Sequence, residues 1–105
     1  MMPLPSQEFF ESLLKKNIRH DPICILFTAS WCGPCGKIDK DYLVSLNITW
    51  YKCDVDENKY TPGYCGVRSI PAFLAIVNGN PQPLFVSSDT YTISEWIKKD
   101  ILKNI

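Results

Sequence analysis

The residues best suited to chemistry are two cysteines, Cys32 and Cys35, which stand three positions apart around Gly33 and Pro34. Residues at this spacing fall near one another on one face of a helix, so their sulfur atoms can close a disulfide without rearranging the chain. When such a pair is reduced, a thiolate on one sulfur can attack a disulfide in another molecule. The spacing therefore predicts reversible thiol-disulfide exchange.

The place of this pair relative to a helix decides which sulfur is reactive. The apolar residues after the pair recur at helical spacing: Ile38, Tyr42, Leu43 and Leu46. If the helix begins at Cys32, that sulfur meets the unpaired amides and positive end of the first turn, which favour thiolate over thiol. Pro34 suits the first turn because its missing N–H needs no partner there. We therefore assign attack to Cys32 and resolution of the mixed disulfide to Cys35.

The abundance of thiolate is a small part of the expected rate. Lowering the pKa of a thiol from about 8.5 to about 7 raises its thiolate fraction at pH 7 from roughly 3% to roughly 50%. The accompanying loss of nucleophilicity leaves attack only about three- to fourfold faster. The larger benefit comes from holding Cys35 beside the mixed disulfide, because the second step then becomes intramolecular.

The same pair could instead be half of a zinc site or two unrelated thiols. A structural zinc needs further ligands at typical spacing, yet eleven residues separate Cys53 from Cys65, and the one histidine, His20, is distant in sequence. We therefore expect no metal. A cysteine-histidine hydrolase is disfavoured because His20, expected in a solvated loop, has no evident third group to orient it.

Three segments predict the strands of a sheet that positions the pair. Residues 23–27 form a continuous apolar run, which is typical of a strand buried on both faces. Residues 48–55 predict a second strand, and residues 72–77 predict a third. The third strand turns at residues 78–79 (Asn-Gly) and returns through residues 84–86, so we expect an antiparallel hairpin.

Helices are predicted before and after these strands. Ser6 can cap the first helix, and Thr92 with Glu95 three residues later forms a capping box for the last one. Residues 56–66 are turn-rich or briefly helical. Each terminal helix carries one apolar stripe: Phe9, Phe10, Leu13 and Leu14 in the first, and Ile93, Trp96, Ile97 and Ile101 in the last. The order of elements predicts an α/β fold, a mixed sheet covered by helices on both faces.

The whole chain limits the setting in which the pair works. Its 105 residues suit a single domain, residues 1–105, and eleven basic residues balance eleven acidic ones, so no net field attracts nucleic acid or an anionic membrane. No apolar run approaches the roughly 20 residues of a membrane helix. The first residues lack the regions of a signal peptide, and the odd count of five cysteines disfavours a disulfide framework. We therefore expect a cytoplasmic protein.

The segment around the pair resembles the active site of the thioredoxin family. Residues 27–35 read Phe-Thr-Ala-Ser-Trp-Cys-Gly-Pro-Cys, residues 54–58 resemble the family's acidic turn, and residues 66–73 resemble the segment that bears its cis-proline. The Asn-Gly turn at residues 78–79 resembles the family's hairpin turn. This similarity extends from about residue 23 to the last helix. It implies the thioredoxin fold, with a central mixed β-sheet flanked by helices on both faces.

The resemblance also implies roles for residues around the pair. Pro71 would be the cis-proline that lies against the two cysteines, and the backbone of Ile70 would bond an extended substrate segment. Trp31, Ile70 and Pro71 would form an apolar docking surface, while Trp31, Gly33 and Pro34 would tune the redox pair. The alternative is that Pro71 merely begins a strand.

The activity implied by the resemblance is reduction of disulfides in other proteins, with no bound cofactor. Electrons would come from a thioredoxin-reductase-like partner that draws on NADPH, and we expect a monomer. The same site could run as a disulfide isomerase or oxidase because the redox potential sets the direction. Gly33 and Pro34 resemble the reducing members. A binding or assembly module built around Trp31 and Pro71 is the alternative from another functional class.

Three residues depart from the family's pattern. Leu26 occupies the place of its usual buried aspartate, Thr28 that of a frequent second tryptophan, and Gly36 that of a frequent lysine or arginine. Resolution requires Cys35 to lose a proton, so water, a different carboxylate or Lys52 must accept it. We therefore expect slower resolution than in a typical thioredoxin.

The remaining cysteines lie outside the motif. Cys24 falls within an apolar strand and Cys53 alternates with Tyr51, so both are expected to pack as small hydrophobic residues. Cys65 lies close in sequence to the loop before Pro71. A packing role and an oxidisable regulatory role both stay open for Cys65.

Overall fold

The apolar segments form a mixed six-stranded sheet in the computed structural model, which describes residues 1–15 and 21–104. The strand order is β1-β3-β2-β4-β5, and β6 also pairs with β4. The central strand β2 runs parallel to β3 and antiparallel to β4, so the sheet is mixed as predicted. The bounds of the strands are β1 Met2–Pro3, β2 Ile23–Thr28, β3 Thr49–Asp54, β4 Ala72–Val77, β5 Asn80–Pro81 and β6 Phe85–Val86.

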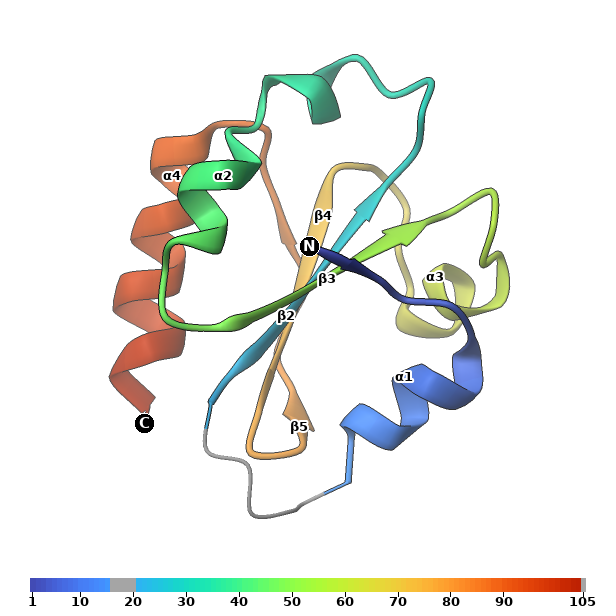
Figure 1. The fold of residues 1–105 in the computed structure, drawn as a ribbon, viewed down its shortest axis with the longest axis horizontal. Coiled ribbons are helices and arrows are strands. Elements are labelled where there is room, and N and C mark those ends of the chain that lie inside the picture. The colour runs from blue at the N-terminus through green and yellow to red at the C-terminus, as the bar shows by residue number, and fades with distance from the viewer. Residues whose placement is uncertain (16–20, 105) are drawn as a thin grey trace.

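Helices cover both faces of this sheet, which confirms the predicted architecture. In Figure 1, α2 and α4 lie together on one side of the central strands, and α1 and α3 lie on the other side. The bounds of these helices are α1 Gln7–Leu13, α2 Lys40–Val44, α3 Tyr60–Cys65 and α4 Thr90–Trp96. Ser6 caps α1 as predicted, because its hydroxyl accepts the N–H of Phe9 at 3.1 Å.

The alternation of side chains along β2 divides the core into two clusters. Ile25 and Phe27 point to the cluster that includes Phe10 of α1, whereas Cys24 and Leu26 point to the cluster covered by α2 and α4. Every residue of β2 is buried. The continuous apolar run therefore marks a strand with helices on both faces.

The Asn-Gly hairpin is confirmed. Asn78 and Gly79 have φ angles of 54° and 80°, the positive values that a tight two-residue hairpin turn requires. The chain then returns as β5 and β6, both antiparallel to β4. Within the described residues, no helix is long and apolar enough to span a membrane.

The predicted continuous helix after the cysteine pair is wrong. The chain forms a short 3-10 turn, η1 Pro34–Lys37, and then becomes extended at Ile38, with a ψ of 129°. A new helix, α2, begins because the carboxylate of Asp39 accepts the N–H of Tyr42 at 3.0 Å and caps it. Pro34 does occupy the first position of its turn, as predicted.

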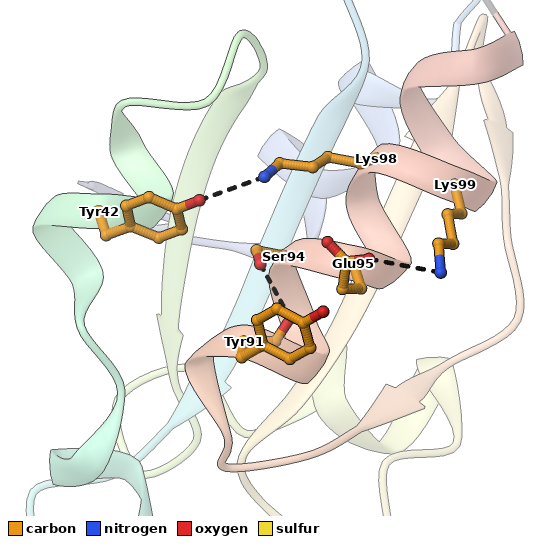
Figure 2. Close-up of polar contacts among 6 residues, drawn as sticks. All are labelled: Tyr42, Tyr91, Ser94, Glu95, Lys98 and Lys99. Carbon is orange, nitrogen blue, oxygen red and sulfur yellow. Dashed lines mark hydrogen bonds and ion pairs between the residues drawn. The ribbon is translucent and has the colours of Figure 1, made fainter.

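The break turns Tyr42 out of the core. Its side chain is 40% exposed, whereas its neighbour Leu43 is fully buried. Figure 2 shows that Tyr42 reaches toward the helical turns that follow α4, where Lys98 Nζ donates to its hydroxyl at 3.3 Å. Only part of the apolar stripe predicted after the cysteine pair therefore lies in the core.

The capping box predicted for the last helix is also wrong. Asp89 caps α4, and both the hydroxyl and the backbone N–H of Thr92 donate to its carboxylate, which lowers the pKa of Asp89. Thr92 lies inside the helix, and Glu95 forms an ion pair with Lys99 at 3.3 Å (Figure 2). The apolar stripe itself is confirmed, since the helical chain continues through η2 Ile97–Ile101 with Ile93, Ile97 and Ile101 buried.

Candidate active site

The two motif cysteines meet just beyond the end of β2. Cys32 and Cys35 are joined by a disulfide, with their Cα atoms 5.4 Å apart. The backbone turns immediately after the strand, where the N–H of Cys32 donates to the carbonyl of Ala29 at 3.1 Å. The structure thus brings together the two sulfur atoms that the sequence selected.

The hydrogen bonding of the pair distinguishes its two sulfur atoms. The backbone N–H of Cys35 donates to Cys32 Sγ at 3.2 Å. Cys32 is 8% exposed and Cys35 only 2%. A backbone donor aimed at a sulfur favours its thiolate form. Of the first-turn amides that the sequence predicted beside Cys32, that of Cys35 donates to its sulfur, and the turn η1 that carries it has only four residues.

The surroundings of the disulfide are apolar. Ala29 belongs to the same buried cluster as the two cysteines, and the half-buried side chains of Val55 and Ile70 pack against that cluster. The peptide bond between Ile70 and Pro71 is cis, as the resemblance implied. The segment before β4 therefore lies beside the pair.

Trp31 forms an exposed aromatic wall next to the disulfide. It is 67% exposed, and its indole N–H donates to a carboxylate oxygen of Asp56 at 2.7 Å. A groove of about 410 Å³ extends from this side chain, and its lining is mainly apolar: Trp31, Val55, Pro62, Val67, Arg68, Ser69 and Ile70. Sequence reasoning missed the role of Asp56 in holding Trp31, although the acidic turn that contains it is plain in the sequence.

Comparison with known proteins identifies the family. The family model described as Thioredoxin matches residues 1–99. The chain belongs to the thioredoxin family. It is 30% identical to the putative thioredoxin-5 of Dictyostelium discoideum over 85% of this chain and 91% of that protein. A chloroplastic M-type thioredoxin of Brassica napus is 32% identical over 83% of this chain, which spans about half (51%) of that relative.

Solved structures bear out the thioredoxin fold. The thioredoxin of Fasciola hepatica superposes with a TM-score of 0.81 at 26% identity, over 94% of this chain and 98% of that one. Family membership together with the bonded cysteine pair supports thiol-disulfide oxidoreductase activity. The chemistry inferred from two cysteines is therefore that of the family.

Leu26 takes part in the apolar core on the side of the sheet covered by α2 and α4. The side chain is fully buried in the cluster that contains Trp50, Phe73 and Ile38, the residue three positions after Cys35. Among the described residues, the buried polar side chains are those of Thr28, Asn58, Thr61 and Ser94. No described carboxylate is therefore buried in the core, where it could accept the proton of Cys35.

Lys52 is not seen at the disulfide. It pairs in register with Leu26, but its exposed side chain lines a cavity of about 530 Å³ beside the first residues of the chain. Asp54 and Glu57 line the same cavity, and no residue of the motif does. The suggestion that Lys52 accepts the proton of Cys35 gains no support from this position.

The other cysteines of this thioredoxin are free and shielded. Burial raises the pKa of Cys24 well above its ordinary value. The pKa of Cys53 rises to about 12, chiefly through burial and further through the nearby Cys65 and Asp54. Both residues lie in the core at 0% exposure, so the predicted packing role is confirmed.

We expect Cys65 to be a poor nucleophile, because burial raises its pKa to about 11. Its thiolate appears only as the pH rises toward that value, so at pH 7.5 it should react with iodoacetamide at least about tenfold more slowly than a thiol of ordinary pKa. Mass spectrometry of the labelled disulfide form measures this rate. The control is labelling in urea, where Cys65 should react at the ordinary rate. Equal labelling rates in native protein and in urea would show that Cys65 is reactive in the folded protein and would support its regulatory role.

The remaining expectations concern metal ligands. In the part of the chain that the structure describes, no group of three or more histidine, cysteine, aspartate or glutamate side chains is arranged to hold a metal ion. The expectation for His20 falls outside the described residues.

Proposed function

We propose that this chain reduces disulfide bonds in other proteins through Cys32 and Cys35. The thiolate of Cys32 attacks one substrate sulfur, forming a mixed disulfide and releasing the other substrate sulfur as a thiolate that takes up a proton. Cys35 then loses its proton and attacks Cys32 Sγ. That step closes the Cys32–Cys35 disulfide and releases the second substrate thiol, so two electrons pass from the protein to the substrate.

The observation that carries this proposal is the inequality of the two sulfur atoms. Cys32 is the more exposed residue of the two, at 8%, and its Sγ accepts the N–H of Cys35 at 3.2 Å, which favours its thiolate. Cys35 is almost fully buried. A substrate disulfide can approach the first sulfur, whereas the second is placed for an intramolecular reaction.

The docking surface that we propose consists of Trp31, Ile70 and Pro71. The groove beside Trp31 offers apolar contacts to an extended chain, and Ile70, one of its lining residues, packs against the disulfide cluster. The backbone of Ile70 is proposed to pair with that chain. Gly33 and Pro34 set the geometry of the turn between the two cysteines and thereby tune the pair.

The setting of the reaction is part of the same proposal. Residues 1–105 act as one thioredoxin-like domain, as a monomer in the cytoplasm, and carry no bound organic cofactor. The disulfide form must be reduced again before another cycle. A thioredoxin-reductase-like partner that draws on NADPH is proposed to supply these electrons.

Reduction of insulin by dithiothreitol tests the activity. Catalytic amounts of the protein should shorten the delay before the insulin B chain precipitates at pH 7, because reduction of the interchain disulfides releases it. As a control, the variant Cys24→Ser removes a buried cysteine outside the motif. It should shorten the delay as wild-type protein does. An unchanged delay with wild-type protein would reject the proposal and favour a binding module that uses the exposed Trp31.

Equilibration of the Cys32–Cys35 pair with glutathione tests the direction. A reductase should have a potential of about −270 mV, well below the values of about −180 to −120 mV at which protein isomerases and oxidants work. A potential near those of known oxidants would assign the site to oxidation or isomerisation instead.

A further inference from the structure

The side chain of Lys40 reaches back to the cysteine pair from the first residue of α2. Its Nζ donates to the backbone carbonyl oxygen of Cys35, 3.3 Å away, and the side chain is half-buried. The N–H of Ile38 points to the same oxygen at 3.4 Å. A positive charge therefore lies against the peptide group of the buried cysteine.

The break in the helix produces this contact. Because the chain is extended at Ile38 and restarts at Asp39, Lys40 begins a new helix instead of following the first one outward. Gly36, directly after Cys35, carries no side chain and so brings no charge to the motif. The cation at the motif thus comes from the element that follows the turn.

The other groups around Cys35 do little to stabilise its thiolate. Its sulfur lies in an apolar cluster that disfavours a thiolate. On the packed elements, Asp54 and Asp56 flank Val55, and the exposed Arg68 lies two residues before Ile70. The Asp56 carboxylate is held by Trp31, and Asp54 accepts the N–H of Asp56 at 2.9 Å. On the segment of the motif itself, the charged neighbours are Lys37 and Asp39, both exposed.

We propose that Lys40 is a positioning residue whose ammonium group stabilises the thiolate of Cys35 while the mixed disulfide is resolved. This inference rests on the proposed function. In that step water takes the proton of Cys35, the thiolate attacks Cys32 Sγ, the new disulfide forms and the substrate sulfur leaves with its electron pair. In this role Lys40 contributes its charge, and the proton of Cys35 goes to water.

Reaction with Ellman's reagent isolates the resolving step. The reduced protein releases a first thionitrobenzoate when Cys32 attacks the reagent, and a second when Cys35 displaces the aryl thiolate from Cys32. Stopped-flow absorbance gives the rate of the second release as a function of pH. The other cysteines are buried or half-buried, so their reactions appear as slower phases.

Replacing Lys40 with glutamine should shift this pH profile upward by about half to one unit. The second release should be about two- to fourfold slower at pH 7, since fewer molecules hold a thiolate although each thiolate is more nucleophilic. On the high-pH plateau, where every molecule holds a thiolate, the same variant should be about two- to threefold faster than wild type. The two profiles therefore cross, which a merely structural defect would not produce.

Two matched variants complete the test. Lys37→Gln removes the same charge from an exposed side chain three residues away and should shift the profile much less, while Lys40→Arg should restore it. Coincident profiles of the two glutamine variants, or a Lys40→Gln rate lowered equally at every pH, would overturn the role of Lys40. If Lys40→Gln does not fold, Lys40→Met, which keeps an apolar stem, takes its place.

The same experiment separates this role from the proposed function. Wild-type protein that releases the first thionitrobenzoate but shows no fast second release has no resolving cysteine, and the proposed function then fails. A normal second release with unshifted Lys40 profiles removes only the role of Lys40.

Discussion

Replacing Cys35 with serine should trap the protein on its substrate as a mixed disulfide through Cys32. In wild-type protein the resolving thiol is already at the site, with the N–H of its own residue 3.2 Å from Cys32 Sγ. In the variant, a millimolar thiol in solution must replace a thiol whose effective concentration is many molar. The lifetime of the complex should therefore rise by at least about a thousandfold. Non-reducing electrophoresis with insulin as substrate measures the trapped fraction.

The variant Cys32→Ser provides the control for this trap. It keeps Cys35, which is only 2% exposed, and should form little mixed disulfide with the same substrate. Equal trapping by the two variants would contradict the division of roles between the cysteines. Loss of the trapped complex on adding dithiothreitol would show that the bond is a disulfide.

The parts of the fold that could be predicted are those fixed by local patterns. A fully apolar run can only be a strand buried on both faces or a buried helix, and the short length of β2 together with its β-branched residues decided between them. The Asn-Gly turn was equally plain, because few other pairs accept positive φ at both positions. The cysteine pair was found for the same reason, since its spacing is a local property.

The errors arose where two local signals competed. Asp89 and Thr92 are both good caps, and the aspartate, three residues earlier, starts the helix first and holds the threonine within it. Asp39 likewise outcompetes the helical spacing of the apolar residues around it. Helix propensity and apolar periodicity do not record helix caps. They could not show that the Asp39 carboxylate starts a second helix within a segment that looked continuous.

The contacts that shape the site were beyond any local pattern. Trp31 and Asp56 are 25 residues apart and meet only because β2 and β3 end side by side. Lys40 reaches Cys35 only because the helix breaks before it. The roles of Cys32, Cys35, Ile70 and Pro71 stay predictions, but the structure now says which neighbours each role depends on.

Replacing Leu26 with aspartate should speed resolution and weaken the fold. Leu26 is fully buried and shares a face of the sheet with its register partners Lys52 and Phe73, so the introduced carboxylate enters the apolar core on that face. As a base for Cys35 it should accelerate mixed-disulfide decay about tenfold or more near pH 7. Stopped-flow kinetics of that decay measures the gain, and no acceleration would sink the idea that a missing base limits this protein.

The cost of the same change should depend on pH in a definite direction. Burial raises the pKa of the introduced carboxyl above its unfolded value of about 3.9, so the fold favours the protonated form. Stability should be least affected below pH 4 and should fall as the pH rises toward the folded pKa, reaching a loss of about 3 to 5 kcal/mol at pH 7. Leu26→Asn is the matched control because it buries a polar side chain of the same shape that cannot take up a proton. It should lose stability at every pH without speeding resolution, so acceleration by the asparagine variant would assign the gain to loosened packing instead of to a base.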